Sequence, residues 1–219
     1  MNLEQKLKYA VIALSLVSAI SVLATSSSVQ SWSYNPAICP DYKYKRTRPG
    51  VVLIDMQDSF LREIDPEEKD REIPNMLQVL EAADINCVPV IVLEYAGHGP
   101  TVGILKDKLD SLNTPVAYIT KKTDDGFYQT EMSETLRALD IDELVLMGIY
   151  ASACVLSTGQ GALEHGFRIS TSRDLIANPQ GVPFIQMKGP EGSTWYQIKG
   201  AMRNNHAEII RTISARNSK

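Results

Sequence analysis

The chain has 219 residues, of which 44% are hydrophobic and 22% charged, and its formal net charge is −4 at pH 7. This composition excludes a disordered chain, and the length suits one domain with a substantial core. The acidic balance provides no basic stripe of the kind that binds nucleic acid, so we expect no nucleic-acid partner. A short basic run precedes the first apolar run and consists of Lys43, Lys45, Arg46 and Arg48. We interpret it as a solvent-exposed segment that leads into the domain.

The N-terminal segment has the pattern of a secretory signal. Lys6 and Lys8 precede an apolar stretch over residues 9–24, and polar residues follow it. Val22 and Ala24 are small enough for the −3 and −1 positions of a cleavage site. Residues 1–24 are therefore predicted to be a signal peptide, with an uncleaved N-terminal anchor as the alternative. The protein is expected to be exported, periplasmic or secreted, or else anchored to a membrane by this segment.

The rest of the chain divides into a linker and one domain. Residues 25–48 are rich in Ser, Pro, Tyr and basic side chains without periodicity, which is typical of a linker. Residues 49–219 then alternate short apolar runs with helical patterns. The predicted strands are Val51–Ile54, Cys87–Leu93, Val116–Thr120, Leu144–Gly148 and Arg168–Ser172. They lack polar alternation, as expected of parallel strands covered on both faces.

Two helical patterns and a third, looser one lie between and after these runs. Ile73, Leu77 and Leu80 form one apolar stripe, and Met132, Leu136 and Leu139 form another, with Thr130 as the expected N-cap; residues 193–213 read as one final helix. Strands alternating with helices predict an α/β fold. Its form is a three-layer αβα sandwich around a mostly parallel, doubly wound sheet.

The three cysteines, Cys39, Cys87 and Cys154, bear on the compartment. If one is kept free for chemistry, Cys39 and Cys87 are the pair available for a disulfide in an oxidising compartment. The alternative is that Cys87 is a small buried hydrophobe at the start of its strand.

An acid, a cation and a thiol follow three of the predicted strands. Asp55 closes the first, Lys121 closes the third, and Cys154 comes shortly after the fourth. The carboxyl ends of parallel strands share one edge of the sheet, so the three side chains can converge there. Cys154 also begins a segment that ends at Gly166, which predicts a thiol at a helix N-terminus, where the helix dipole and a nearby lysine would lower its pKa.

The sequence around these residues resembles the isochorismatase-like cysteine hydrolases. The similarity lies in residues 52–60, in residues 119–130 and in residues 148–155 with Thr158, Ala162 and Gly166, and it extends from about residue 49 to residue 177. Of two adjacent lysines, Lys121 rather than Lys122 keeps the family's spacing to Phe127. The resemblance implies an isochorismatase-like fold, a homo-oligomer and no cofactor.

The resemblance also implies a mechanism. Cys154 would attack a carbonyl carbon of a small amide-like substrate, Asp55 would act as general base, and Lys121 would stabilise developing charge. The backbone N–H groups of Tyr150 and Cys154 would form the oxyanion hole, helped by a cis Ile149–Tyr150 peptide. The cysteine points to hydrolysis of C–N bonds, because family members that cleave a vinyl ether lack it.

Strand-end positions suggest the substrate pocket, and the histidines suggest no metal. The expected pocket residues are Gln57, Phe60, Tyr95, Phe127 and Tyr150. The metal motif of nicotinamidases is missing from the sequence. The three histidines are not at ligand spacing. We interpret His98 as an exposed loop residue, with a place in the pocket lining as the alternative, His165 as a helix-end residue and His206 as a surface residue.

Other function classes fit the sequence less well. A binding or interaction protein that keeps this fold is the main alternative to an enzyme, and it is disfavoured because such a protein would tolerate loss of a catalytic residue, whereas Asp55, Lys121 and Cys154 are all present. An aspartyl phosphate site at Asp55 is disfavoured because phosphatases need a second carboxylate where Gln57 stands, and because an exported receiver domain makes little sense. A nucleotide-binding domain is disfavoured because no Gly-rich turn follows the first strand.

Overall fold

The computed structural model describes residue 39 and residues 48–183 and 193–215 of the chain. The predicted signal or anchor, residues 1–24, and most of the predicted linker lie outside the described residues. Arg48 is the exception within the basic run: it is buried, its guanidinium lies 2.8 Å from Asp140 and its N–H donates to Asp142. The interpretation of that run as wholly solvated is therefore wrong at Arg48.

The centre of the domain is a parallel sheet, as predicted. Its strands follow the order β3-β2-β1-β4-β5-β7, with β6 beside β4, and every strand pair is parallel. Their bounds are β1 Pro49–Ile54, β2 Val90–Tyr95, β3 Val116–Lys121, β4 Glu143–Ile149, β5 Arg168–Ser172, β6 Ile176–Ala177 and β7 Met202–Arg203. The first strand, β1, lies in the middle of the sheet. β2 and β3 follow on one side of it, and β4, β5 and β7 follow on the other, which is the doubly wound topology.

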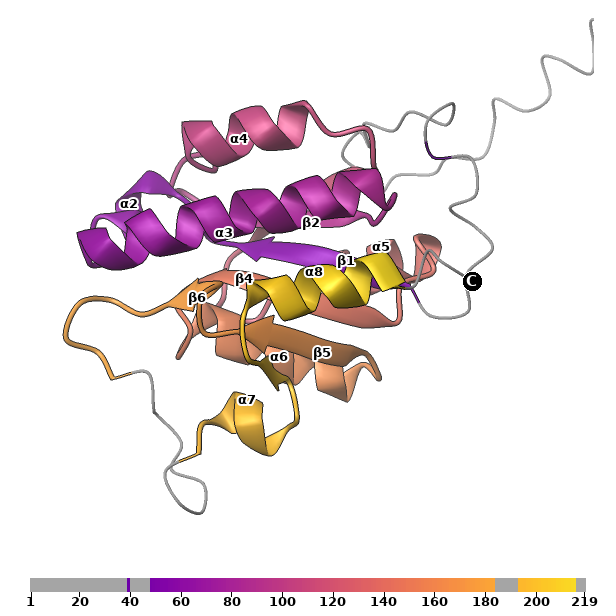
Figure 1. Cartoon of the computed structure of the whole chain (residues 1–219). Coiled ribbons are helices and arrows are strands. Elements are labelled where there is room, and N and C mark those ends of the chain that lie inside the picture. Colours follow the sequence, from indigo (N-terminus) through magenta and orange to yellow (C-terminus); the bar gives the residue numbers. More distant parts are fainter. Residues whose placement is uncertain (1–38, 40–47, 184–192, 216–219) are drawn as a thin grey trace, which may run out of the picture. The chain divides into compact units, whose positions relative to one another are not determined.

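Helices cover both faces of the sheet (Figure 1). On one face lie α3 (Pro66–Ile85), α4 (Gly103–Asp110) and α8 (His206–Ala215). The other carries α5 (Met132–Ala138), α6 (Cys154–Glu164) and α7 (Trp195–Ile198), and the short α2 (Asp58–Leu61) follows β1. β1 and β4 are buried throughout, so their unbroken apolar sequences match an interior position between the two helix layers.

Three details of the predicted elements change. Residues 193–213 form two helices with β7 between them, because Gly200 takes φ +68° and the following residues pair with β5. The N-cap of α5 is Glu131 and not Thr130. Thr130 lies one position before the cap, and its hydroxyl accepts a hydrogen bond from the Met132 N–H. Cys87 precedes β2, in a turn with φ +52°. Within the described part of the chain, no helix is long and apolar enough to cross a membrane.

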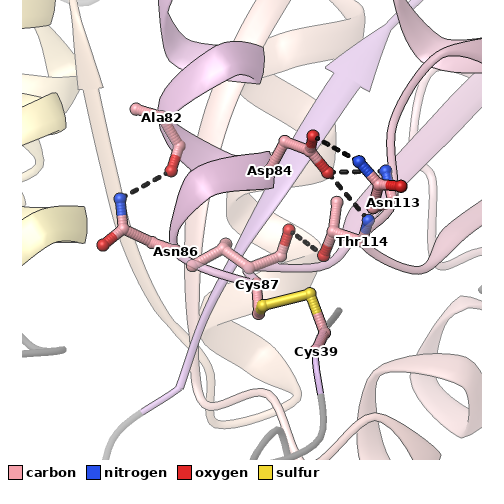
Figure 2. The surroundings of a disulfide bond; sticks show 8 residues. Cys39, Ala82, Asp84, Asn86, Cys87, Asn113 and Thr114 are labelled. Atoms are coloured by element: carbon pink, nitrogen blue, oxygen red, sulfur yellow. Dashed lines mark hydrogen bonds between the residues drawn. A yellow bond between two sulfur atoms is a disulfide. The ribbon is translucent and has the colours of Figure 1, made fainter. Parts of the chain in front are cut away.

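A disulfide joins Cys39 to Cys87, as the cysteine count allowed (Figure 2). Cys39 is buried against the turn between α3 and β2. Asp84 supports this region by accepting hydrogen bonds from the backbone N–H groups of Asn113 and Thr114 (Figure 2). The turns before β2 and β3 lie at the amino ends of these strands, so the disulfide lies at the edge of the sheet opposite to Asp55 and Lys121.

Candidate active site

The carboxyl edge of the sheet brings the predicted acid, cation and thiol together. Asp55 follows β1, Lys121 ends β3, and Cys154 is the first residue of α6 after β4. Gly148 makes the approach of β4 to β1 feasible: its φ is +128°, and a Cβ there would lie 2.1 Å from the Ile54 carbonyl oxygen. Only glycine fits this position, directly beside the residue that precedes Asp55.

Asp55 and Lys121 form a buried ion pair. Lys121 Nζ lies 2.7 Å from Asp55 Oδ2, and the two side chains are 0% and 1% exposed. Lys121 also donates to the Thr123 carbonyl at 3.0 Å and lies 4.3 Å from the centre of the Tyr95 ring. Beyond Lys121 and the neighbouring Cys154 thiol, Asp55 has no described hydrogen-bond partner, which leaves acceptor capacity for a proton or a substrate N–H. Burial raises the pKa of Asp55, and the Lys121 charge opposes that rise.

Cys154 lies beside this pair as a thiol rather than as a ready thiolate. Burial, followed by the negative charge of Asp55, raises the pKa of Cys154 above its ordinary value, and Lys121 only partly offsets this. The expectation of a lowered pKa is therefore wrong: desolvation and a neighbouring carboxylate outweigh the helix N-terminus and the lysine. A protonated thiol becomes nucleophilic only when a base takes its proton, and Asp55 is a carboxylate beside it.

The peptide that leads from β4 into the turn before Cys154 has the expected cis form. The Ile149–Tyr150 bond is cis, and among the described residues the N–H groups of Tyr150 and Cys154 donate to no other residue. The turn between β4 and α6 is held from outside by Asn178, whose Oδ1 accepts from both the N–H and the hydroxyl of Ser152 at 2.9 Å. The hydroxyl of Tyr196 donates to the Ala151 carbonyl.

A second carboxylate reaches the thiol. Cys154 Sγ donates to Asp124 Oδ1 at 3.5 Å, and Asp124 is exposed. Thr158 on α6 fixes the loop that carries Asp124, because its hydroxyl donates to the Asp124 carbonyl and accepts from the Gly126 N–H. A side chain at Gly126 would require its neighbours to move, since a Cβ would lie 2.5 Å from a methyl group of Leu93.

Two of the five expected pocket residues have other roles. Gln57 is fully buried, and its amide bonds both the N–H and the carbonyl of Tyr95 and the carbonyl of Gly99, so it fixes the loop after β2 and has no surface to offer a substrate. Phe127 is buried and stacks on His165 at the far end of α6 from Cys154. Sequence position placed both near strand ends, but side-chain direction takes them away from the site.

The other three expected pocket residues form one aromatic cluster with His98. Phe60 contacts Tyr95 and Tyr150 edge to face, with ring centres 5.9 and 5.7 Å apart, and stacks on His98 at 4.3 Å. All four side chains are partly exposed. Ser59 holds His98 through its ring Nδ1 at 3.0 Å, so His98 belongs to the cluster and is more than an exposed loop residue. The cluster borders Asp55, Lys121 and Cys154, because Lys121 Nζ lies over the Tyr95 ring and because Tyr150 feels the charges of Asp55 and Cys154.

Comparison of the sequence with models of known protein families identifies the family of this chain. Residues 49–182, more than half of the chain, match the model of the isochorismatase domain. The chain belongs to the isochorismatase family. This is a family of hydrolases, and the resemblance drawn from the sequence motifs is confirmed.

Individual relatives of this isochorismatase-family chain are distant. It is 36% identical over 64 residues to streptothricin hydrolase of Streptomyces noursei, covering 29% of this chain but only 23% of that protein. It is 24% identical over 148 residues to nicotinamidase 3 of Arabidopsis thaliana, covering 58% and 72% of the two chains. The MAR1 ribonuclease of Caenorhabditis elegans superposes with a TM-score of 0.63, at 24% identity over 78% of this chain and 84% of that one, a likeness that establishes the fold.

Several residues that support this isochorismatase-family site were not singled out from the sequence. Asp124 and Asn178 lie in loops that no periodicity describes, and Tyr196 belongs to the tail that the sequence assigned to one helix. Across the described ranges, no group of three His, Cys, Asp or Glu side chains is arranged to hold a metal ion. His206 Nδ1 instead lies 2.5 Å from Asp174 Oδ2, and His165 is the C-cap residue of α6.

Proposed function

We propose that this protein hydrolyses a C–N bond of a small amide-like substrate through a thioester on Cys154. The observation that carries the proposal is the buried Asp55–Lys121 pair, 2.7 Å apart, next to a thiol at the start of α6. A buried carboxylate with unused acceptor capacity is suited to take a proton from that thiol. Relatives that are named for hydrolysis of streptothricin and nicotinamide support the amide class.

The proposed reaction has two halves. Asp55 takes the thiol proton as Cys154 Sγ attacks the carbonyl carbon, and the oxyanion accepts hydrogen bonds from the N–H groups of Tyr150 and Cys154. The C–N bond then breaks as Asp55 passes the proton to the leaving nitrogen, which leaves a thioester. Asp55 next takes a proton from water, which attacks the thioester, and the acid product and the thiol are released. Lys121 keeps the buried carboxylate charged and in place.

The test is direct detection of the thioester. The protein is mixed with a panel of primary amides, ureido compounds and lactams, quenched in acid and weighed intact, while release of ammonia or amine is followed. A mass increase equal to the acyl group, absent from Cys154→Ala and removed by hydroxylamine, supports the proposal. Binding of a panel member without turnover or adduct favours the alternative, a binding protein that keeps this fold.

The setting of the enzyme belongs to the same proposal. Export into an oxidising compartment agrees with the Cys39–Cys87 disulfide, since such bonds persist mainly outside the cytosol. A nucleic-acid substrate is disfavoured by the carboxylate of Asp124 at the nucleophile, which would repel phosphates. A homo-oligomer and a membrane attachment through an uncleaved N-terminus stay predictions, tested by light scattering and by fractionation of cells.

A further inference from the structure

We infer that Asp124 is a specificity residue that makes the site select amides carrying a positive charge near the scissile bond. This inference rests on the proposed function, because it names the substrate class of the same site. It starts from two facts: Asp124 Oδ1 lies 3.5 Å from the nucleophile, and the residue is exposed. A substrate that reaches Cys154 therefore passes within a few ångströms of this carboxylate.

The charge of Asp124 is not neutralised by a described neighbour. Its only bond to a described side chain is the one from the Cys154 thiol, and no described lysine or arginine forms an ion pair with it. The buried basic side chain of the site, Lys121, is paired with Asp55. Asp125, next along the chain, differs: its Oδ1 accepts from the Phe127 N–H and it packs against Gly161 of α6. One of two adjacent aspartates is thus structural, and the other faces the nucleophile.

A second, independent observation also points to a ligand rich in N–H groups. Asp55 is 1% exposed, and apart from Lys121 and the neighbouring Cys154 thiol it has no described hydrogen-bond partner. Buried polar atoms seldom keep unused acceptor positions. Two carboxylates with spare acceptor capacity therefore flank the thiol. Lys121 balances the charge of Asp55, so an anionic substrate would be repelled by Asp124, while an ammonium or amidine group would be attracted to it.

The aromatic cluster agrees with this charge preference. Phe60, Tyr95 and Tyr150 present partly exposed rings beside the triad, and aromatic faces attract cations. Glu63 lies close enough to Tyr150 to help raise the pKa of its hydroxyl, so it adds negative charge on that side. Opposing charges come from the exposed side chains of Lys122, two residues before Asp124, and of Arg62, next to Glu63.

The test uses charged reagents that report on Cys154 without a known substrate. With Cys39 and Cys87 joined, Cys154 is the free thiol of the chain. Its sulfur attacks a methanethiosulfonate, forming a mixed disulfide and releasing methanesulfinate. The trimethylammonium-ethyl and sulfonato-ethyl reagents are cationic and anionic versions of the same molecule. Any change in the pKa of the thiol affects both rates equally. The ratio of the two rates therefore reports only the electrostatic effect of the charges around Cys154.

A unit charge about 6 Å away in a water-like dielectric changes each rate about threefold, in opposite directions, which is about tenfold in the ratio. We expect the cation-to-anion ratio to exceed that of 2-mercaptoethanol by about tenfold at low salt. Asp124→Asn should remove most of this preference, and 0.5 M NaCl should weaken it. Asp107→Asn, an exposed change of equal charge on α4, is the matched control and should leave the ratio unchanged. An unchanged ratio in Asp124→Asn would overturn the inference.

A second measurement separates this inference from the proposed function. Glycinamide, propionamide and malonamate are cationic, neutral and anionic amides of similar size, and acyl-enzyme formation with each is followed by mass. A preference for glycinamide that is lost in Asp124→Asn supports both proposals. Acylation without any charge preference contradicts the inference about Asp124 and leaves the proposed function standing. Charge-selective labelling of Cys154 without acylation by any amide in the wider panel contradicts the proposed function and leaves the inference about Asp124 standing.

Discussion

Asp55→Asn should separate ionisation of the nucleophile from turnover. The Asp55 charge is the second-largest cause, after burial, of the raised pKa of Cys154. At about 5 Å with an effective dielectric of about 20, one charge contributes about 3 kcal/mol, or about two pKa units. Removing it should lower the pKa of the thiol by about one to two units. Turnover should nevertheless fall by about 10²-fold or more, because the base is gone.

Lys121→Met is the opposing variant. The Lys121 charge lowers the pKa of Cys154, so its removal should raise that pKa while turnover also falls. The assay is the pH dependence of iodoacetamide alkylation at Cys154, read by mass spectrometry, alongside turnover of the substrate found in the amide panel. A variant that merely unfolds would expose the thiol and bring its pKa back to about 8.5 in both cases.

The control for folding matters, because each single change leaves one buried charge unpaired. Circular dichroism identifies loss of structure, and the double variant Asp55→Asn with Lys121→Met removes both charges of the pair. The reasoning is refuted if folded Asp55→Asn has an unchanged or raised thiol pKa. Retention of turnover by that variant would equally refute the role of Asp55 as base.

Four further outcomes are expected. Because burial raises the pKa of Asp55, kcat/KM should rise with pH through a midpoint above the usual aspartate value, and an acid limb near pH 4 or no acid limb would contradict this. Gly148→Ala should cost about 3 kcal/mol or more in chemical denaturation, since a Cβ would meet the Ile54 carbonyl at 2.1 Å, whereas Gly103→Ala, with nothing within 4 Å, should cost little. Cys39→Ser should lower the free energy of unfolding by about 2–4 kcal/mol, because the disulfide closes a loop across a separation of 48 residues, and thiol counting on the unfolded, unreduced protein should give one free thiol rather than three. Burial raises the pKa of Glu72 to about 8, so between about pH 4.5 and pH 8 this carboxyl group holds a proton in the folded state that it loses on unfolding. The free energy of unfolding should therefore fall as pH rises over that range, and the melting temperature of Glu72→Gln should depend less on pH there.

The sequence by itself determined the sheet and the three reactive residues. Unbroken apolar runs such as those of β1 and β4 can only be buried on both faces, and a residue directly after a parallel strand must lie at the carboxyl edge. Asp55, Lys121 and Cys154 therefore follow from local pattern. The Cys39–Cys87 bond was one of the outcomes that the cysteine count left open, and the structure decided it.

Only the tertiary structure decided how side chains are directed and what they experience electrically. Gln57 and Phe127 stand near strand ends in sequence, yet they point into a loop network and into the core. The raised pKa of Cys154 arises from burial and from Asp55, a residue 99 positions earlier, and neither can be read from the helix start alone. Asp124 reaches the thiol because Thr158 on α6 fixes its loop. Such effects depend on distances between segments that are far apart in the chain, and those distances exist only after folding.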